Sequence, residues 1–233
     1  MFGIRRRHAT AIAVTSSIPI VFGSARDPVA GGIVGSLNRP GANRTGVVSL
    51  TTELVPKRLE MLHEVVPSAR TISVLLNPSA RTGETQPPNE LQLAAPGLGL
   101  QLNVVRASTE PELDAALASL GQMASKALMI PPDAFFLDRR AQLGALTLRH
   151  GIPAIHSYRE FAAAGGLMAY GGSRTEQGHQ VGVYTGRILK GEKAADLPVY
   201  QGTKELVINL KAAKTLGITF PLPLLGRADE VIE

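Results

Sequence analysis

The chain has 233 residues, of which 44% are hydrophobic, and this suffices for one large globular domain or two smaller lobes. It contains no cysteine, which excludes a thiolate nucleophile, a disulfide framework and a cysteine-based metal site. The net charge of +5 is scattered apart from the run Arg5-Arg6-Arg7-His8, and with no Trp and 4% aromatic residues we expect no nucleic-acid partner.

The N-terminal segment MFGIRRRHATAIAVTSSIP has basic residues followed by a weakly apolar stretch. That stretch is short and is interrupted by threonine and serine, so it makes a poor secretory signal. No apolar run in the sequence reaches the roughly 18 residues that cross a bilayer. We therefore expect neither a recognisable signal peptide nor a transmembrane helix.

The first predicted elements surround Asp27. The apolar run at residues 18–22 predicts a short buried strand, and VAGGIVGSL after Asp27-Pro28 predicts a helix. An Asp followed by Pro is typical of a helix start, where the carboxylate caps the helix. Strand-to-helix turns are also where open α/β sheets bind ligands, so we expect Asp27 both to cap its helix and to face a cleft.

Strands and helices alternate along the rest of the chain. Continuous apolar runs predict strands at residues 45–50, 71–76, 102–105, 127–130, 153–155, 166–170 and 206–209. Helices are expected at residues 54–66 and 87–99, after the capping box at 109–112, from Pro132 to about His150, and up to Lys190. Because parallel strands require helical crossovers that cover the sheet, the alternation predicts an α/β fold of two Rossmann-like lobes with parallel sheets.

Small polar residues follow the ends of the predicted strands, where ligands lie in such folds. They occur at residues 23–27, 49–53, 77–79, 132–133, 156–159 and 170–173. Structural roles compete with ligand binding at these positions. Asn77-Pro78 is typical of a turn, Asp133 is typical of a helix cap, and Tyr158 and Tyr170 are typical half-buried aromatic residues.

Motifs of common enzyme classes are absent from the sequence. Gly31-Gly32-Ile33-Val34-Gly35 is not the dinucleotide-binding GxGxxG, and there is no P-loop, GxSxG or HExxH motif. His150, His156 and His179 lack metal-ligand spacing, and His156 is typical of a hydrogen-bonded loop histidine. We expect a protein that binds a ligand without catalysis and that has no cofactor or metal.

Several long segments, in order, carry a family resemblance. They are IPIVFGSARDPVAGGIVGSLNRPGANRTGV, ELVPKRLEMLHEVVP, the strand ending in LLNP, YREFAAAGGLMAYG and LVINLKAAKTLGITFPLPLLGRADEVIE. Together they resemble the ABC-transporter substrate-binding protein family that includes tryptophan and tyrosine binders. The resemblance implies a type I periplasmic-binding fold that closes on a small molecule such as an amino acid or related acid, a periplasmic location, and a membrane permease as partner.

The resemblance also implies roles for single residues. It places Ser24 and Asp27 on the edge of the first lobe, Asn77, Asp133 and Tyr158 on the second, and Tyr170 near the hinge. A carboxylate such as Asp133 or Asp27 would pair with a ligand ammonium, while Ser24 and a helix N-terminus would receive a ligand carboxylate. Two alternatives stay open: the cytoplasmic ligand-sensing core of a regulator, although no helix-turn-helix module precedes the lobes, and an α/β enzyme.

The same resemblance predicts the domain organisation. Residues 1–52 are expected to be a remnant of lobe 1, 53–171 lobe 2, 172–200 a return to lobe 1, and 201–233 a C-terminal crossover segment, with Gly171-Gly172 at a crossover. Few residues precede IPIVF, so on the order of 60 to 90 residues of lobe 1 are expected to be missing. An incomplete sheet exposes a strand edge, so we expect self-association through this lobe.

Overall fold

The computed structural model describes residues 15–80, 86–123 and 126–233, and the basic run from Arg5 to His8 lies outside them. The chain divides into two compact units. Unit 1 comprises Met1–Thr52 and Gly172–Lys204, and unit 2 comprises Glu53–Gly171 and Glu205–Glu233. The chain therefore passes between the units three times, after Thr52, after Gly171 and after Lys204.

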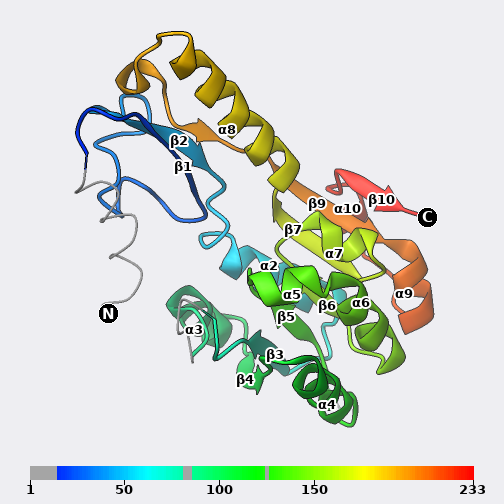
Figure 1. The fold of residues 1–233 in the computed structure, drawn as a ribbon. Helices are drawn as coiled ribbons and strands as arrows, with labels where there is room; N and C mark the ends of the chain where they lie inside the picture. The colour runs from blue at the N-terminus through cyan, green and yellow to red at the C-terminus, as the bar shows by residue number, and fades with distance from the viewer. Residues whose placement is uncertain (1–14, 81–85, 124–125) are drawn as a thin grey trace. The chain divides into compact units, whose positions relative to one another are not determined.

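Unit 2 is an α/β domain around a seven-stranded sheet in the part of the chain that the structure describes (Figure 1). Its strands are β3 (Thr71–Leu76), β4 (Gln101–Arg106), β5 (Leu128–Ile130), β6 (Ala154–His156), β7 (Met168–Gly172), β9 (Lys204–Asn209) and β10 (Glu230–Ile232). Its helices are α2 (Val55–Val65), α3 (Asn89–Gly97), α4 (Glu110–Gly121), α5 (Ala134–Asp138), α6 (Arg140–Arg149), α7 (Arg159–Ala163), α9 (Leu210–Leu216) and α10 (Leu222–Leu225). The strand order is β10-β9-β7-β6-β5-β3-β4, and the pairs β3–β4, β3–β5, β5–β6, β6–β7 and β9–β10 are parallel.

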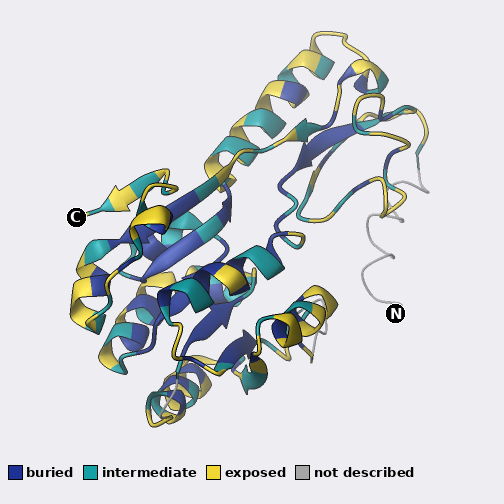
Figure 2. Cartoon of the chain, turned by 180° about the vertical axis from the view of Figure 1, so that it is seen from behind, coloured by how far each residue is buried: buried dark blue, intermediate teal, exposed yellow. Residues whose placement is uncertain are grey.

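Successive residues of the central strands enter opposite faces of this sheet. On β3, Val74 packs in a core with α2 and α3, whereas the next residue, Leu75, packs in a second core with α4 and α6. On β5, Met129 joins the first core and Ile130 the second. Figure 2 shows the strands of this sheet largely in the colour of buried residues. Burial on both faces explains why these strands are continuous apolar runs in the sequence.

Unit 1 contains a three-stranded sheet in its described residues, with the order β1-β2-β8 and parallel pairing. Its elements are β1 (Ile20–Ser24), β2 (Arg44–Val48), α8 (Arg174–Leu189), the 3-10 turn η1 (Ala194–Asp196) and β8 (Tyr200–Gln201). Phe22, Val34, Val48 and Val199 form its small buried core. Helix α8 packs against both β1 and β2.

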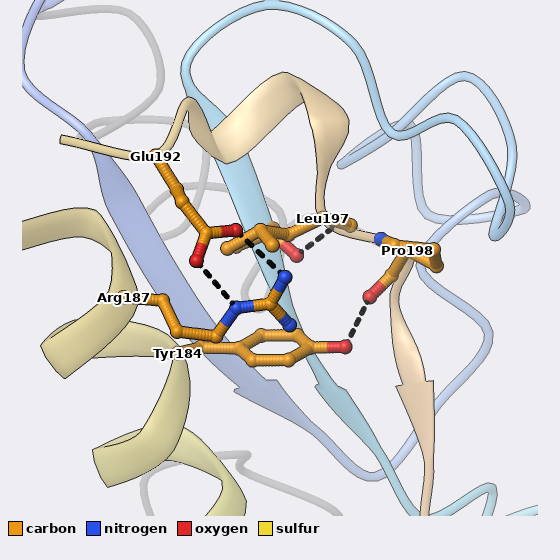
Figure 3. A network of polar contacts seen from close by, with 6 residues as sticks. Tyr184, Arg187, Glu192, Leu197 and Pro198 are labelled. Carbon is orange, nitrogen blue, oxygen red and sulfur yellow. Dashed lines mark hydrogen bonds and ion pairs between the residues drawn. The ribbon is translucent and has the colours of Figure 1, made fainter. Parts of the chain in front are cut away.

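Polar side chains connect α8 and β2 of unit 1 to the segment that returns from α8 to the sheet. The buried Tyr184 of α8 donates its hydroxyl to the Pro198 carbonyl at 2.7 Å, and Thr45 of β2 donates to the Leu197 carbonyl at 2.7 Å. Arg187 forms two hydrogen bonds with Glu192 and lies over the Tyr184 ring, as Figure 3 shows. These contacts hold the returning chain in line to form β8 as the third strand.

Two helix predictions are wrong. No regular helix follows Pro28: Gly31 donates to the Asp27 carbonyl in a single turn, and Gly32 then adopts φ +68°, which ends it. The helix expected from Pro132 to His150 is two helices, α5 and α6, because Arg139 has φ −102° and ψ 21° between them. Elements α7, α9, α10, β8 and β10 are not among the sequence predictions.

Gly46 lies in the centre of the unit 1 sheet, opposite Phe22. A Cβ at this position would lie 2.2 Å from the Phe22 carbonyl oxygen and 2.7 Å from its ring. We expect Gly46→Ala to lower the free energy of unfolding of unit 1 by about 1–3 kcal/mol, measured by urea denaturation followed by circular dichroism.

Gly178→Ala is the matched control, because α8 leaves open space around its Cβ position. This variant is expected to keep or raise stability by about 0.5–1 kcal/mol, since alanine favours helix more than glycine does. Equal unfolding curves for the two variants would contradict the steric argument.

Candidate functional site

The strand order of unit 2 changes direction between β3 and β5. The chain passes from β3 outward to β4 on one side and then continues from β5 to β6 and β7 on the other. Asn77 follows β3 directly and Asp133 follows β5 after two prolines, so both lie at the carboxyl ends of these adjacent strands. Such a point is the usual ligand crevice of open α/β sheets.

The structure brings Asn77 and Asp133 into contact. Asn77 Nδ2 donates to Asp133 Oδ1 at 3.2 Å. The same Oδ1 accepts hydrogen bonds from the backbone N–H groups of Phe135 at 2.9 Å and Phe136 at 3.2 Å, so Asp133 caps α5, as its sequence context predicts. Within the described residues, no donor is directed at Oδ2 of this partly buried carboxylate. One oxygen of Asp133 therefore fixes the side chain while the other stays open to a further partner.

Asn77 also forms the turn that its Asn-Pro sequence predicts. Its Oδ1 accepts from the backbone N–H of Ser79 at 3.0 Å, and its carbonyl accepts from the N–H of Ala80 at 3.0 Å. Ser108, directly beyond β4, also accepts from the Ser79 N–H at 3.3 Å. Both ends of the Asn77 side-chain amide are engaged, so its orientation is determined by protein contacts.

A buried cation contacts the main chain of Tyr170, one of the predicted site tyrosines of unit 2. Arg58 of α2 is fully buried, and its Nη1 donates to the Tyr170 carbonyl at 3.0 Å. Burial lowers the pKa of the Arg58 guanidinium to about 10, and the Tyr158 and Tyr170 hydroxyl groups oppose this shift. The residue was missed by sequence reasoning, although an Arg on the apolar face between Val55 and Leu62 was the signal.

The end of β6 supplies further buried polar groups. Tyr158 donates its backbone N–H to His156 Nδ1 at 3.0 Å, and the two rings lie 5.6 Å apart. His156 is hydrogen-bonded, as expected, but the expected loop position is wrong, because His156 is the buried last residue of β6. Ser157 between them is fully buried, and its Oγ has no hydrogen-bond partner in the described part of the chain.

The predicted residues of unit 1 serve local turns. Ser24 at the end of β1 donates its hydroxyl to the Arg26 carbonyl at 2.8 Å and accepts from the Arg26 N–H at 3.2 Å. Asp27 Oδ1 accepts from the N–H groups of Val29 at 2.8 Å and Ala30 at 3.3 Å. Asp27 therefore caps a turn and not the regular helix that was expected, while its exposure to a cleft stays a prediction.

The N-terminal end of α8 carries polar residues that sequence reasoning did not select. Glu176 accepts hydrogen bonds from the Tyr200 hydroxyl, the Thr203 N–H at 2.9 Å and the Thr203 hydroxyl at 2.6 Å. Desolvation raises the pKa of Glu176, but the hydrogen bonds from Thr203 and Tyr200 outweigh it and lower the pKa overall. Glu176 thus stays a carboxylate and fastens the end of β8 to α8.

The described residues contain no group of three or more His, Asp or Glu side chains that could hold a metal ion. Among the helices that the structure describes, none combines the length and apolar character needed for a membrane span.

A family model described as ABC transporter substrate binding protein matches residues 3–232. Among curated proteins, the chain is similar to a tyrosine-binding protein of Clostridioides difficile, with 28% identity over 204 residues. That match covers 87% of this chain and 58% of the relative, so the chain spans somewhat more than half of the relative's length.

Two solved structures are also similar over most of this chain. A conserved domain protein from Vibrio cholerae has a TM-score of 0.76 and 26% identity, and the match covers 96% of this chain and 75% of that one. An ABC domain from Streptococcus pneumonia, solved in complex with L-Trp, has a TM-score of 0.73 and 25% identity, with 97% and 75% covered. Both matches support the two-lobed α/β architecture with parallel sheets.

Two substitutions of Asp133 distinguish the contribution of its helix cap to stability from that of its negative charge. Asp133→Ala removes the acceptor for two backbone N–H groups and for Asn77, so we expect it to lower the free energy of unfolding by about 1–2 kcal/mol. Asp133→Asn keeps an Oδ1 acceptor and is expected to stay within about 0.5 kcal/mol of the wild type.

Chemical denaturation of the two variants checks this, with Asp138→Ala on the exposed side of α5 as the control. A stability loss in Asp133→Asn as large as in Asp133→Ala would show that the charge and not the cap stabilises this turn.

Proposed function

Because this chain belongs to the ABC transporter substrate binding protein family, we propose that it is a solute-binding receptor for an aromatic amino acid or a related small acid. The receptor hands this ligand to the membrane permease of an ABC importer. The relative from Clostridioides difficile is a tyrosine-binding protein, and the Streptococcus structure holds L-Trp, which favours this ligand class. The same family membership supports a periplasmic or extracellular site of action, which is part of this proposal.

The open oxygen of Asp133 is the observation that carries the proposal. The other carboxylate oxygen of Asp133, Oδ1, accepts hydrogen bonds from Asn77 and from two backbone N–H groups. These bonds fix the direction of Oδ2 at the point in unit 2 where the strand order reverses. A fixed carboxylate oxygen suits a ligand ammonium, because a charge-assisted hydrogen bond to it needs no further ordering of the protein. Asn77 beside it would help to orient the ligand.

Tyr158 and Tyr170 supply the apolar surface for an aromatic ring. Both are partly exposed; Tyr158 follows β6, and Tyr170 lies inside β7, where its carbonyl accepts a hydrogen bond from the buried Arg58. An aromatic side chain presents a large rigid face at low conformational cost, which suits stacking with a second ring. In unit 1, Ser24 and Asp27 lie at the equivalent position beyond β1 and are proposed as additional ligand contacts.

The family consists of substrate-binding proteins and not of enzymes, and we propose that this chain binds its ligand without changing it. The regulator core and the α/β enzyme are not favoured by the family match. The carboxyl-end residues described above are engaged as caps and turns, an arrangement that suits recognition.

Ligand class is tested by thermal unfolding and calorimetry with L-Trp, L-Tyr and L-Phe. Ligand at a hundred times its dissociation constant is expected to stabilise the chain by about 2.7 kcal/mol and to raise Tm. Tryptamine and indole-3-propionate test separately the need for the carboxylate and for the ammonium.

Asp133→Asn is the matched variant, because it keeps the cap and removes the charge. We expect it to weaken L-amino acid binding by roughly tenfold or more and to leave indole-3-propionate unaffected. Chemical alteration of the ligand during incubation, or an unchanged Tm with every compound, would contradict the proposed function.

Self-association is the second expected property. Strand β1 lies at the edge of the unit 1 sheet and pairs only with β2 in the described residues. An unprotected parallel edge offers backbone donors and acceptors to a further strand. Gly23 of β1 is exposed, and a Cβ there meets nothing within 4 Å.

Light scattering after size exclusion tests this edge. The wild type is expected to show a mass above 24.6 kDa that rises with concentration, and Gly23→Lys is expected to shift it toward the monomer, because an edge lysine opposes strand pairing. Gly178→Lys on α8 is the control and should behave as the wild type. A monomeric wild type at every concentration would exclude association through β1.

A further inference from the structure

Arg58 lies where burial of its positive charge carries a desolvation cost. Its side chain is fully buried on α2 among Val55, Leu59 and Leu62, where an apolar side chain of similar length would pack without desolvation cost. Its pKa of about 10 still leaves the guanidinium charged near neutral pH. One contact that an apolar residue could not provide is the 3.0 Å hydrogen bond from Nη1 to the Tyr170 carbonyl.

The two ends of this hydrogen bond lie close in sequence to two crossovers of the chain. Unit 2 begins at Glu53, and α2, which carries Arg58, starts two residues later at Val55. Tyr170 is followed by Gly171, the last residue of unit 2 before the chain returns to unit 1. The bond therefore joins the unit 2 ends of the first and the second crossover through Arg58 and Tyr170, which are 112 residues apart in sequence.

The end of β6 packs against the end of β7, close to the hydrogen bond between Arg58 and Tyr170. A Cβ on Gly171 would lie 2.1 Å from the Ser157 carbonyl oxygen, so the end of β7 approaches the end of β6 more closely than any other residue would allow. Ser157 is fully buried, and Tyr158 follows it. Helix α2, the end of β6 and the end of β7 are thus held together by one buried guanidinium and one glycine contact.

We propose that Arg58 is a positioning residue that makes the unit 2 ends of the first two crossovers a single rigid base. In these two crossovers, backbone rotation during ligand binding is then confined to residues 52–53 and 171–172, and Tyr158 and Tyr170 keep a constant position relative to each other. This inference rests on the receptor function proposed above, and it assigns Arg58 no contact with the ligand.

Hydrogen exchange of the ligand-free full chain tests the proposal. In Arg58→Met, amides in residues 50–56 and 168–174 are both expected to exchange about tenfold faster or more, because both crossovers lose their common anchor. Peptides of β4 and α4, remote in the sheet order, are expected to be unchanged. Arg58→Lys keeps a donor without the planar guanidinium and is expected to lie between the wild type and Arg58→Met.

Arg149→Met is the matched control, since Arg149 is exposed in the last turn of α6. Unchanged exchange in both crossover segments, or acceleration in one segment alone, would overturn the inference. Equal acceleration throughout unit 2 in both Arg58 variants would also overturn it, because it would mean general destabilisation.

The same variants separate this inference from the proposed function. Exchange is measured without ligand, so its outcome does not depend on which compound binds. A wild type that binds no aromatic amino acid would count against the receptor function alone. With L-Trp or L-Tyr as the probe, Arg58→Met is expected to raise Kd about tenfold, since a looser base lowers the population of the binding-competent state.

Discussion

Burial of the seven-stranded sheet on both faces is the constraint on which the candidate site depends. Parallel strands that are covered on both faces need a helical crossover after each strand, and the crossovers bring every carboxyl end to one edge of the sheet. Asn77, Asp133 and Tyr158 follow β3, β5 and β6, so this constraint alone places them along one edge, whereas Tyr170 lies inside β7. The reversal of strand order between β3 and β5 then opens that edge at Asn77 and Asp133.

The structural roles of the polar residues at this edge are compatible with the ligand-binding roles proposed for them. Asp133 caps α5 through one oxygen and retains a second oxygen in a fixed direction. Asn77 closes a turn with its carbonyl and carboxamide oxygens while its amide nitrogen contacts Asp133. A helix cap or a turn is thus no argument against ligand binding at the same residue, because a side chain with two polar atoms can serve both.

The sequence predicts much of the fold because hydrophobic periodicity is strong in buried strands. The strand at Thr71–Leu76 has the predicted bounds, and Thr109 caps α4 through the Glu112 N–H as the capping box indicates. The helix after Pro28 is wrong because Gly31 and Gly32 allow the chain to leave the helical region after one turn. The break at Arg139 has no proline or glycine as a signal, so periodicity alone joined α5 to α6.

Arg58 shows why the polar interior of a site resists prediction from one sequence. A single Arg on an otherwise apolar helix face is usually expected to extend its head group to water. Its partner here is a backbone carbonyl, and a carbonyl has no sequence signature, since every residue carries one. Only the fold brings Tyr170 within reach of α2. Because Arg58 binds the main chain, its hydrogen bond fixes the path of β7 whichever side chain stands at position 170.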